Sequence, residues 1–343
     1  MKLPVQAPFP PMEAKSALAI PKGSEWRYEP KWDGFRCLAF RENQKVELQS
    51  KAGESLTRYF PELVAALERV KAKKFVLDGE IILLLGEKLS FDDLLKRIHP
   101  AESRVRELSE SHPVRMVVFD LVVDEKGESL VDVPFGERRE MLEAFSGKYL
   151  ERDSTFILSP QAGTLEVAKG WLSSMRGQLD GVVAKRIDLT YRSGERAMQK
   201  IKMLRTADCV VGGFRYLSQE HLAGSLLLGL YDSKGLLQHV GFTSSISAES
   251  RPELTAKLEK LIEAPGFTGR APGRVSRWSS KRTSEWEPLR PVLVAEVRYD
   301  HFTGHRFRHG TRFLRWRPDK TPGQCLMKQV EKDTRSPLDL LKQ

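Results

Sequence analysis

The pattern of polar and apolar residues predicts a pair of strands near the start of the chain. Lys45–Ser50 alternates with a period of two, which is typical of strands with one buried face, and Arg36–Arg41 is an apolar run bounded by two arginines. Glu42–Gln44 lies between the two segments and would supply the turn of a hairpin. The first 23 residues carry prolines and lysines without such a period, so we expect them to be irregular.

Two longer apolar runs predict buried strands. Phe75–Leu85 is interrupted only by the acidic stretch Asp78-Gly79-Glu80. Met116–Val123 carries one acid, Asp120. Short apolar runs of this kind are typical of strands in a core, so the acids are expected beside buried sheet.

Three further segments have the spacing of helices. In the first of them, Leu63, Leu67 and Val70 fall on one helical face. The three segments are Phe60–Val70, Glu137–Phe145 and Leu165–Met175. Strands and helices together give the first part of the chain an α+β class.

The pattern changes near Leu204–Asp208. Beyond this boundary the chain has short β-like runs and one helical segment, Ser250–Ala264. The runs are Cys209–Phe214, Ser225–Tyr231, Gln238–Phe242, Val292–Tyr299 and Thr311–Arg317. Short strands with one helix favour a small β-barrel of the OB type. We therefore expect two domains, residues 1–204 and residues 205–343.

Composition excludes several classes of protein. The chain has 56 Lys and Arg against 46 Asp and Glu, a net charge of +10, which suits nucleic acid, acidic lipid or phosphorylated ligands. No apolar run approaches the roughly 18 residues of a membrane span, and the proline-rich start has no signal-peptide core. Cys37, Cys209 and Cys325 form neither a disulfide framework nor a Cys-x-x-Cys site. We expect a cytoplasmic protein without a membrane partner.

One lysine stands just before an Asp-Gly turn, in Glu29-Pro-Lys31-Trp-Asp-Gly-Phe-Arg36. A lysine is a nucleophile only when neutral, and its ordinary pKa is near 10.4. Burial or neighbouring cations would have to lower that pKa. Taken alone, the motif is equally compatible with a surface hairpin that carries an ordinary lysine and arginine.

Charged residues elsewhere have the spacing of a phosphate site. Lys200 and Lys202 share one face of a strand, where they repel each other unless an anion lies between them. Glu80 and Asp180 lie beside apolar strands, and two carboxylates with phosphate oxygens make a site for Mg²⁺. Taken singly, the lysines could protect a sheet edge and the acids could lie in turns.

Taken together, the motifs resemble those of the covalent nucleotidyltransferases, which include DNA ligases, RNA ligases and capping enzymes. Within this superfamily the sequence resembles the small bacterial ATP-dependent DNA ligases associated with end joining, over roughly Ser24–Lys320. The motifs, in order, are Lys31-Trp-Asp-Gly-Phe-Arg36, Ser50-Lys51-Ala-Gly53, Asp78-Gly-Glu80, Val118-Phe119-Asp120, Asp180-Gly-Val-Val-Ala-Lys185, Lys200-Ile-Lys202 and Arg317-Pro-Asp319-Lys320.

This resemblance implies a nucleotidyltransferase (adenylation) domain followed by an OB-fold domain, with ATP and Mg²⁺ or Mn²⁺ as cofactors. Lys31 would attack the α-phosphate of ATP and form lysyl–AMP. AMP would pass to the 5′-phosphate of a nick in duplex DNA, and the 3′-hydroxyl would then displace it. Cations near Lys31 would lower its pKa and stabilise the transition state.

The resemblance also implies roles for other residues. Glu29 would contact the adenine edge, and Phe119, which alone would be a core residue, would stack on the ring. Glu80 would hold the ribose or a metal, and Asp180 would help to bind a divalent ion. The remaining nucleotide-binding candidates are Arg36, Lys51, Lys185, Lys200, Lys202, Arg317 and Lys320, of which Lys200 and Lys202 would neutralise the α-phosphate and the last two would orient pyrophosphate when the domains close.

Two positions depart from the family pattern. Lys51 stands where arginine is usual, and lysine lacks the two-pronged fork of a guanidinium. Asp180 stands where glutamate is frequent, so its shorter side chain would change the distance to a metal. Both residues keep the required charge.

The segment Arg298–Lys320 has seven basic residues against Asp300 and Asp319, a net charge of +5, and aromatic residues lie between them. This combination suits a nucleic-acid backbone, although an amphipathic strand pair with its aromatics in the core has the same pattern. Histidines at 301, 305 and 309 have the spacing of a helical metal face, but the intervening glycines oppose a helix.

Two other functions are compatible with the sequence. One is the same covalent chemistry on RNA, as an RNA ligase or an mRNA-capping guanylyltransferase. The other is a basic binding protein with degenerate motifs, which the intact Lys31 and Glu80 oppose. Under the ligase interpretation we expect a monomer that binds nicked duplex DNA and acts with end-binding or other repair proteins.

Overall fold

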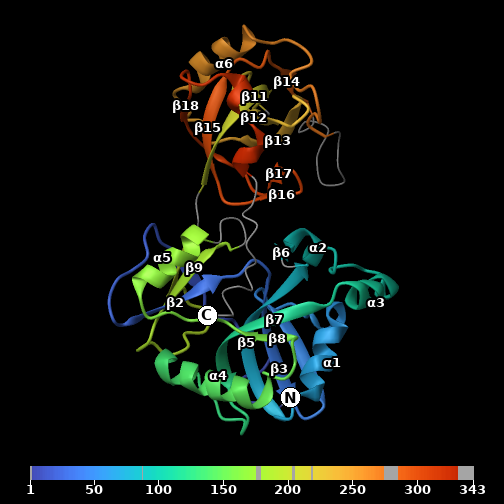
Figure 1. Ribbon diagram of the computed structural model, residues 1–343, viewed down its shortest axis with the longest axis vertical. Helices are drawn as coiled ribbons and strands as arrows, with labels where there is room; N and C mark the ends of the chain where they lie inside the picture. The colour runs from blue at the N-terminus through green and yellow to red at the C-terminus, as the bar shows by residue number, and fades with distance from the viewer. Residues whose placement is uncertain are drawn as a thin grey trace. The chain divides into compact units, whose positions relative to one another are not determined.

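The computed structural model describes residues 2–86, 88–174, 179–202, 205–217, 219–273 and 285–330. These residues form two compact units, one ending at Lys202 and one made of the described residues beyond it (Figure 1). Among the residues described, no helix is long and apolar enough to cross a membrane. The last residue of the predicted helix Leu165–Met175 lies outside these ranges.

The larger sheet of the first unit has the strand order β4-β3-β5-β7-β8, and β6 pairs with β5 beside this path. The strands are β3 (Phe35–Glu42), β4 (Lys45–Ser50), β5 (Lys74–Leu85), β6 (Lys88–Leu89), β7 (Val114–Val123) and β8 (Phe156–Leu158). The predicted hairpin is confirmed, because β3 and β4 pair with Glu42 opposite Lys45. Strand β5 continues through Asp78 and Glu80, so these acids lie within the sheet and not in a turn.

Helices pack on this sheet through their apolar stripes. They are η1 (Thr57–Tyr59), α1 (Pro61–Arg69), α2 (Phe91–Leu95), α3 (Glu102–Ser111) and α4 (Phe135–Tyr149). One more helix of this unit, α5 (Leu165–Ser174), packs on the smaller sheet described below. Leu63 and Leu67 of α1 and Leu142 of α4 are fully buried in one cluster with β5 and β7. The sequence pattern did not predict α3, because Val105 and Leu108 alone are too few apolar residues for a clear stripe.

The N-terminal segment is mostly irregular, as expected, but it packs into the core. Leu3, Val5 and Met12 are buried in a cluster that covers Leu38 and Phe40 of β3. Strand β1 (Ala14–Ser16) follows them. The prediction of an irregular segment is wrong only at Ala14–Ser16, because residues 2–13 and 17–23 form neither helix nor strand. Leu3, Val5 and Met12 therefore pack into the core from irregular backbone.

A smaller sheet completes the first unit. Its strand order is β1-β10-β9-β2, and its remaining strands are β2 (Trp26–Lys31), β9 (Gly181–Arg186) and β10 (Met198–Lys202). Residues Trp171 of α5 and Ile82 of β5 share its core cluster. The two sheets are therefore joined by common packing within this unit.

The second unit is a small β-barrel. Its strand order is β13-β12-β11-β15-β18, with β14 on β11, and the path closes where Thr243 bridges Thr311. Its elements are β11 (Arg205–Tyr216), β12 (Ala223–Tyr231), β13 (Leu237–Thr243), α6 (Arg251–Glu259), β14 (Glu287–Pro288), β15 (Val294–Tyr299), β16 (Phe302–Thr303), β17 (Arg306–Phe307), β18 (Arg312–Trp316), η3 (Pro322–Gln324) and η4 (Met327–Val330). This architecture confirms the predicted OB-type fold.

Candidate active site

Three strands of the smaller sheet place the reactive lysine beside other charged residues. One row of the sheet runs from Lys31 in β2 through Gly181 in β9 to Lys202 in β10. The row two residues away runs from Glu29 in β2 to Lys200 in β10. Residues two apart share one face of a strand, so these four charged side chains start from the same face. A Cβ at Gly181 would lie 2.0 Å from a backbone oxygen of β10, so only glycine fits between the strands.

The charges closest to Lys31 are carboxylates. Lys31 Nζ is ion-paired with Asp180 Oδ2, and the Asp180 N–H donates to the Lys31 carbonyl oxygen at 2.9 Å. Burial lowers the pKa of Lys31, but attraction to Asp180 and Glu80 outweighs burial and raises this pKa above its usual value. The expectation that cations would lower it is therefore wrong for this structure. The pKa of Lys200, in contrast, is lowered by burial and by repulsion from Lys31.

Glu80 is held where β5 passes close to the turn after Lys31. The Gly34 N–H donates to Glu80 Oε1 at 3.1 Å. A Cβ at Gly34 would lie 2.0 Å from the Ile81 carbonyl oxygen, so the glycine of the Asp-Gly motif is needed for this close approach. Burial raises the pKa of Glu80 to about 7, against the opposing effect of Lys31 and Arg36.

A β-bulge in β7 presents Phe119 to the site. Asp78 of β5 lies opposite Asp120, whereas Gly79 lies opposite Val118. Phe119 is therefore an extra residue in β7, and bulges re-aim side chains in this way. Its ring lines the cavity that also contains Lys31.

Lys185 contacts both Glu29 and Phe119, the two residues expected to bind adenine. Its buried Nζ lies 2.9 Å from Glu29 Oε2 and donates to the Phe119 carbonyl oxygen at 3.0 Å. Glu29 Oε1 accepts no hydrogen bond within the described part of the chain, and Arg139 Nη1 lies 3.7 Å from it. Lys185 thus holds Glu29 and Phe119 together and leaves one buried acceptor unused.

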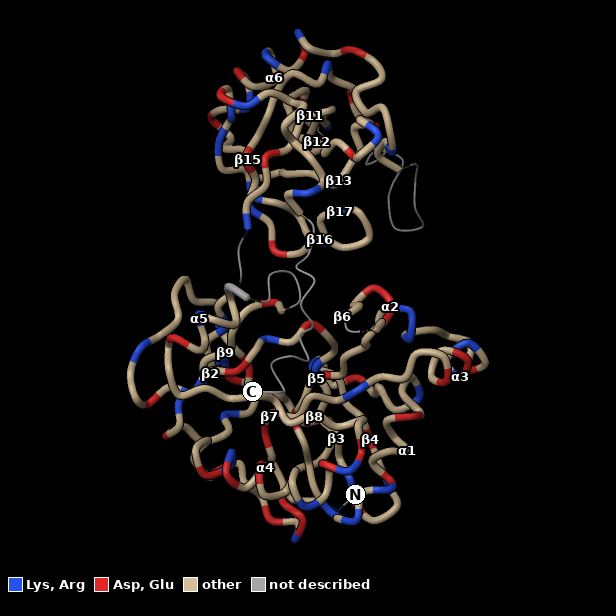
Figure 2. Tube along the Cα trace, in the orientation of Figure 1, with Lys and Arg blue, Asp and Glu red and all other residues tan. Residues whose placement is uncertain are grey.

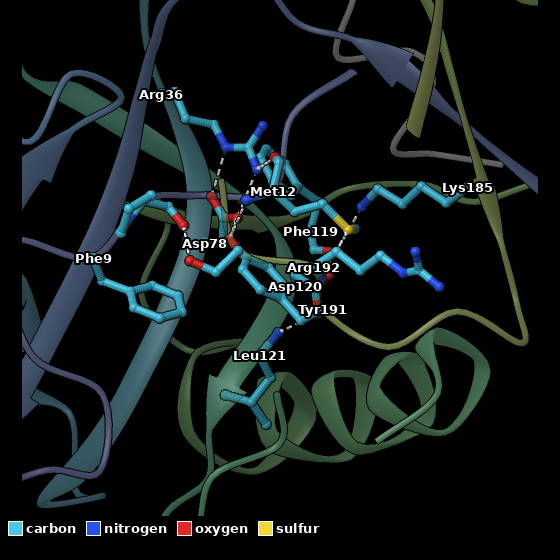
Figure 3. A network of polar contacts seen from close by, with 12 residues as sticks. Phe9, Met12, Arg36, Asp78, Phe119, Asp120, Leu121, Lys185, Tyr191 and Arg192 are labelled. Atoms are coloured by element: carbon cyan, nitrogen blue, oxygen red, sulfur yellow. Dashed lines mark hydrogen bonds and ion pairs between the residues drawn. The ribbon is translucent and has the colours of Figure 1, made fainter. Parts of the chain in front are cut away.

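Figure 3 shows Arg36 and Tyr191 converging on Asp78. Arg36 donates to both oxygens of Asp78 at 2.7 Å, and the Tyr191 hydroxyl donates to Asp78 Oδ2 at 2.6 Å. Arg36 also donates to the Met12 carbonyl oxygen, and its guanidinium lies 4.8 Å from the Phe119 ring centroid. Sequence reasoning missed Tyr191 and gave Asp78 no role. Only the acidic motif on an apolar run could have pointed to Asp78, and no local pattern marks Tyr191.

These residues surround one cavity of about 770 Å³, which is within the range of small-ligand sites. The cavity offers a buried acceptor on Glu29, the ring of Phe119 and several cations, and these groups suit the base and the phosphates of a nucleotide. Lys51 borders it with Nζ 2.9 Å from Glu13 Oε2. The charged and aromatic candidates that line it are Glu29, Lys31, Arg36, Lys51, Glu80, Phe119, Lys185 and Lys200.

Glu80 and Asp180 are the candidate metal ligands, and both act on the charge of Lys31. Within the described ranges, no group of three or more His, Cys, Asp or Glu side chains is arranged to hold a metal. A hard divalent cation takes six or more oxygen ligands, so these two carboxylates alone do not complete a metal site.

Arg317 and Lys320 belong to the second unit. There Arg317 Nη1 lies 2.9 Å from Asp208 Oδ1, and Lys320 is ion-paired with Asp208 Oδ2.

In the basic segment Arg298–Lys320, Tyr299 and Phe307 are only 4% and 5% exposed, so these aromatics pack in the core of the barrel. Lys and Arg are interspersed with Asp and Glu along the trace of each unit (Figure 2).

Comparisons with known proteins agree with this geometry. Residues 11–202 match the family model of the ATP dependent DNA ligase domain, and residues 219–320 match the ATP dependent DNA ligase C terminal region. The chain is 42% identical to DNA ligase C of Mycobacterium tuberculosis, over 97% of this chain and 96% of that protein. It is 43% identical to DNA ligase C1 of Mycolicibacterium smegmatis, over 96% of each.

Two more distant matches also cover most of this chain. The multifunctional non-homologous end joining protein LigD of Mycobacterium bovis is 28% identical over 92% of this chain, which spans 39% of that protein. A solved structure from a study of Lig E DNA ligases has a TM-score of 0.53 at 15% identity, over 89% of this chain and 99% of that one, and shows the likeness of fold. On these grounds, the chain belongs to the family of ATP-dependent DNA ligases.

Proposed function

We propose that the first unit is the adenylation domain and that Lys31 carries AMP. A neutral Lys31 Nζ attacks the α-phosphorus of ATP, a P–N bond forms, and the bond to the β-phosphate breaks to release pyrophosphate. The position of Lys31 in a nucleotide-sized cavity, between Asp180, Glu80 and the lysines of β10, is the observation that carries this proposal.

Different residues around Lys31 would bind the base and the phosphates of ATP. Glu29 Oε1, a buried acceptor with no donor among the described residues, suits the amino group of adenine. Phe119 would stack on the base. Lys200 and Lys202 would neutralise phosphate oxygens, because phosphoryl transfer depends chiefly on positioning and charge neutralisation.

Lys31 must lose its proton before it attacks, and Asp180 and Glu80 oppose this loss. A divalent cation bound by these two carboxylates would supply positive charge to neutralise them and the phosphate oxygens. With less negative charge beside it, Lys31 Nζ gives up its proton more readily. Mg²⁺ and Mn²⁺ both suit oxygen ligands of this kind.

The second and third steps would act on DNA. AMP passes from Lys31 to the 5′-phosphate of a nick in duplex DNA, and the 3′-hydroxyl then attacks that phosphate and releases AMP. The second unit would supply Arg317 and Lys320 to orient pyrophosphate in the first step. End-binding or other repair proteins are proposed partners, and the ligase is proposed to act as a monomer.

The intact mass of the protein tests the first step. Incubation with ATP and Mg²⁺ should add one AMP, and Lys31→Ala should show no added mass while it keeps its fold. Protein that is already adenylated should lose this mass on treatment with pyrophosphate. A GMP adduct formed only from GTP would favour the capping reaction, and adduct formation by Lys31→Ala would contradict the role of Lys31.

A further inference from the structure

A nearly buried carboxylate in the second unit holds two cations side by side. Asp208 lies on β11, and its side chain is 9% exposed. Its Oδ1 accepts a hydrogen bond from Arg317 Nη1 at 2.9 Å, and its Oδ2 is ion-paired with Lys320. Each oxygen thus contacts a different cation, and the attraction offsets the repulsion that would otherwise separate Arg317 from Lys320.

The backbone of Asp208 is fixed independently of these cations. Asp208 lies opposite Glu296 in the β11–β15 ladder. The side-chain amide of Gln329 binds the same residue twice, because its Oε1 accepts from the Asp208 N–H at 3.0 Å and its Nε2 donates to the Asp208 carbonyl oxygen at 3.1 Å. The carboxylate therefore projects from a rigid point of the barrel.

Asp319 binds Arg317 in a different way. Its side chain is 61% exposed, and it accepts from Arg317 Nε and Nη2 at 2.9 and 2.7 Å. This contact is bidentate, but it joins residues only two apart in one turn, and its carboxylate is largely exposed to solvent. Asp208 instead is anchored by the ladder and by Gln329, so it stays in place when an anion arrives.

We propose that Asp208 is a positioning residue for the adenylation step, which holds Arg317 and Lys320 as a preassembled pair for the pyrophosphate part of ATP. The proposal rests on the proposed function, because it requires these two cations to act on ATP. Preassembly matters because cations already in place need no reorganisation when charge develops on the leaving group. Asp208 itself would not touch the nucleotide.

Separating the reaction steps tests this role. In Asp208→Asn, adenylation of the full-length enzyme by ATP should slow by about 10- to 100-fold, the size of effect that misplacement of a catalytic group produces. Sealing of a nicked duplex that already carries AMP on its 5′-phosphate, without ATP, should stay close to the wild-type rate. Glu259→Gln removes the same charge from an exposed acid of the second unit and should change neither step.

A double-mutant comparison tests whether Asp208 acts through the cations. Lys320→Ala should itself slow adenylation. When Arg317 and Lys320 are both replaced by alanine, adding Asp208→Asn should cause little further loss, because residues in one network are not additive. A full additional loss would mean that Asp208 acts elsewhere and would overturn the proposal.

Other outcomes would overturn it as well. Unchanged adenylation by Asp208→Asn would show that the carboxylate has no role in this step. Faster adenylation would show that it competes with ATP for the two cations. If this variant unfolds, Gln329→Ala keeps the carboxylate but releases its backbone, and it should slow adenylation alone; equal loss of both steps would indicate only a structural role. Wild-type protein that forms no AMP adduct would contradict the proposed function, whereas normal adenylation by Asp208→Asn beside slow adenylation by Lys320→Ala would contradict this inference alone.

Discussion

At the scale of single residues, the site is built from buried charges that hold one another in place. Lys185 is 3% exposed at its side chain and is paired with Glu29, which is equally buried. Breaking such a pair leaves an uncompensated charge in the core, which costs more than the pair contributes when intact. Lys185 therefore supports the site through the position of Glu29 and Phe119.

Lys185→Met should lower the free energy of unfolding by about 3 kcal/mol, because Glu29 then stays buried without its closest cation. Arg186→Met is the matched control, since the neighbouring arginine pairs with Asp188 at the surface and such pairs contribute at most about 1 kcal/mol. Urea unfolding of both variants measures the difference. Equal effects would show that Arg139 compensates Glu29 fully.

A second residue makes the stability of the barrel depend on pH. Burial, with repulsion from Arg215, lowers the pKa of His239 from 6.5 to about 4. The unfolded chain takes up this proton as the pH falls below 6.5 and the folded protein does not, so stability is lost between pH 6.5 and 4. The loss from this residue reaches at most about 3 kcal/mol.

The melting temperature tests this dependence on pH. Wild type should lose thermal stability more steeply than His239→Gln between pH 7 and 4.5, because the variant has no group to titrate at this position. Calorimetry at several pH values gives both curves. Parallel curves would mean that His239 is protonated in the folded barrel.

At the scale of elements, the crossing of the turn after Lys31 with β5 depends on the absence of a side chain. Gly34→Ala would place a Cβ 2.0 Å from the Ile81 carbonyl oxygen. The strands must then separate, and the hydrogen bond from the Gly34 N–H to Glu80 is lost. We expect lower stability and loss of AMP transfer to Lys31.

The control for this variant is Gly147→Ala. Gly147 is exposed in α4, where an added Cβ would meet no atom within 4 Å. Removing a helical glycine stabilises a protein by up to about 1 kcal/mol, so this variant should melt at or above the wild-type temperature and keep its activity. Normal AMP transfer by Gly34→Ala would show that the site tolerates wider spacing of the strands.

Elements with a regular period could be predicted from the sequence. Strand β4 and helix α1 are examples, because one buried face imposes their periodicity, and strands β3, β11 and β12 could be predicted as apolar runs because both of their faces are buried. Helix α3 and strand β1 could not, since only a few residues of each meet the core. The bulge that presents Phe119 is a matter of register between β5 and β7, which no local pattern contains.

The candidate site shows the same limit. Motif order identified Lys31, Glu29, Glu80 and Lys200, which the structure brings to one cavity. The direction of the Lys31 pKa could not be predicted, because it depends on which charges lie nearest in space. Tyr191 completes the Arg36–Asp78 network from a loop distant in sequence, so only the fold reveals it.

At the scale of the whole molecule, the basic charge is partly neutralised before any DNA binds. Within the segment Arg298–Lys320, Arg315 donates to Glu296 at 2.6 Å, and Arg317 and Lys320 contact Asp208. Counting basic residues therefore overstates the charge that can contact phosphates. Arg298 and Arg312 are arranged differently from these ion-paired cations, because they lie directly opposite each other on β15 and β18. Like charges in this arrangement repel, and a phosphate between them would relieve that repulsion.

The salt dependence of DNA binding tests which of these cations contact phosphate. Arg312 is exposed and makes no ion pair with any residue that the structure describes. Each phosphate contact adds about 0.9 to the slope of log K against log salt, so Arg312→Ala should weaken binding to nicked duplex and reduce the slope by about 1. Arg315→Ala should change the slope less, because Glu296 already holds that guanidinium. Fluorescence anisotropy over a range of salt concentrations measures both slopes. An unchanged slope for Arg312→Ala would show that the DNA phosphates are contacted by cations other than Arg312.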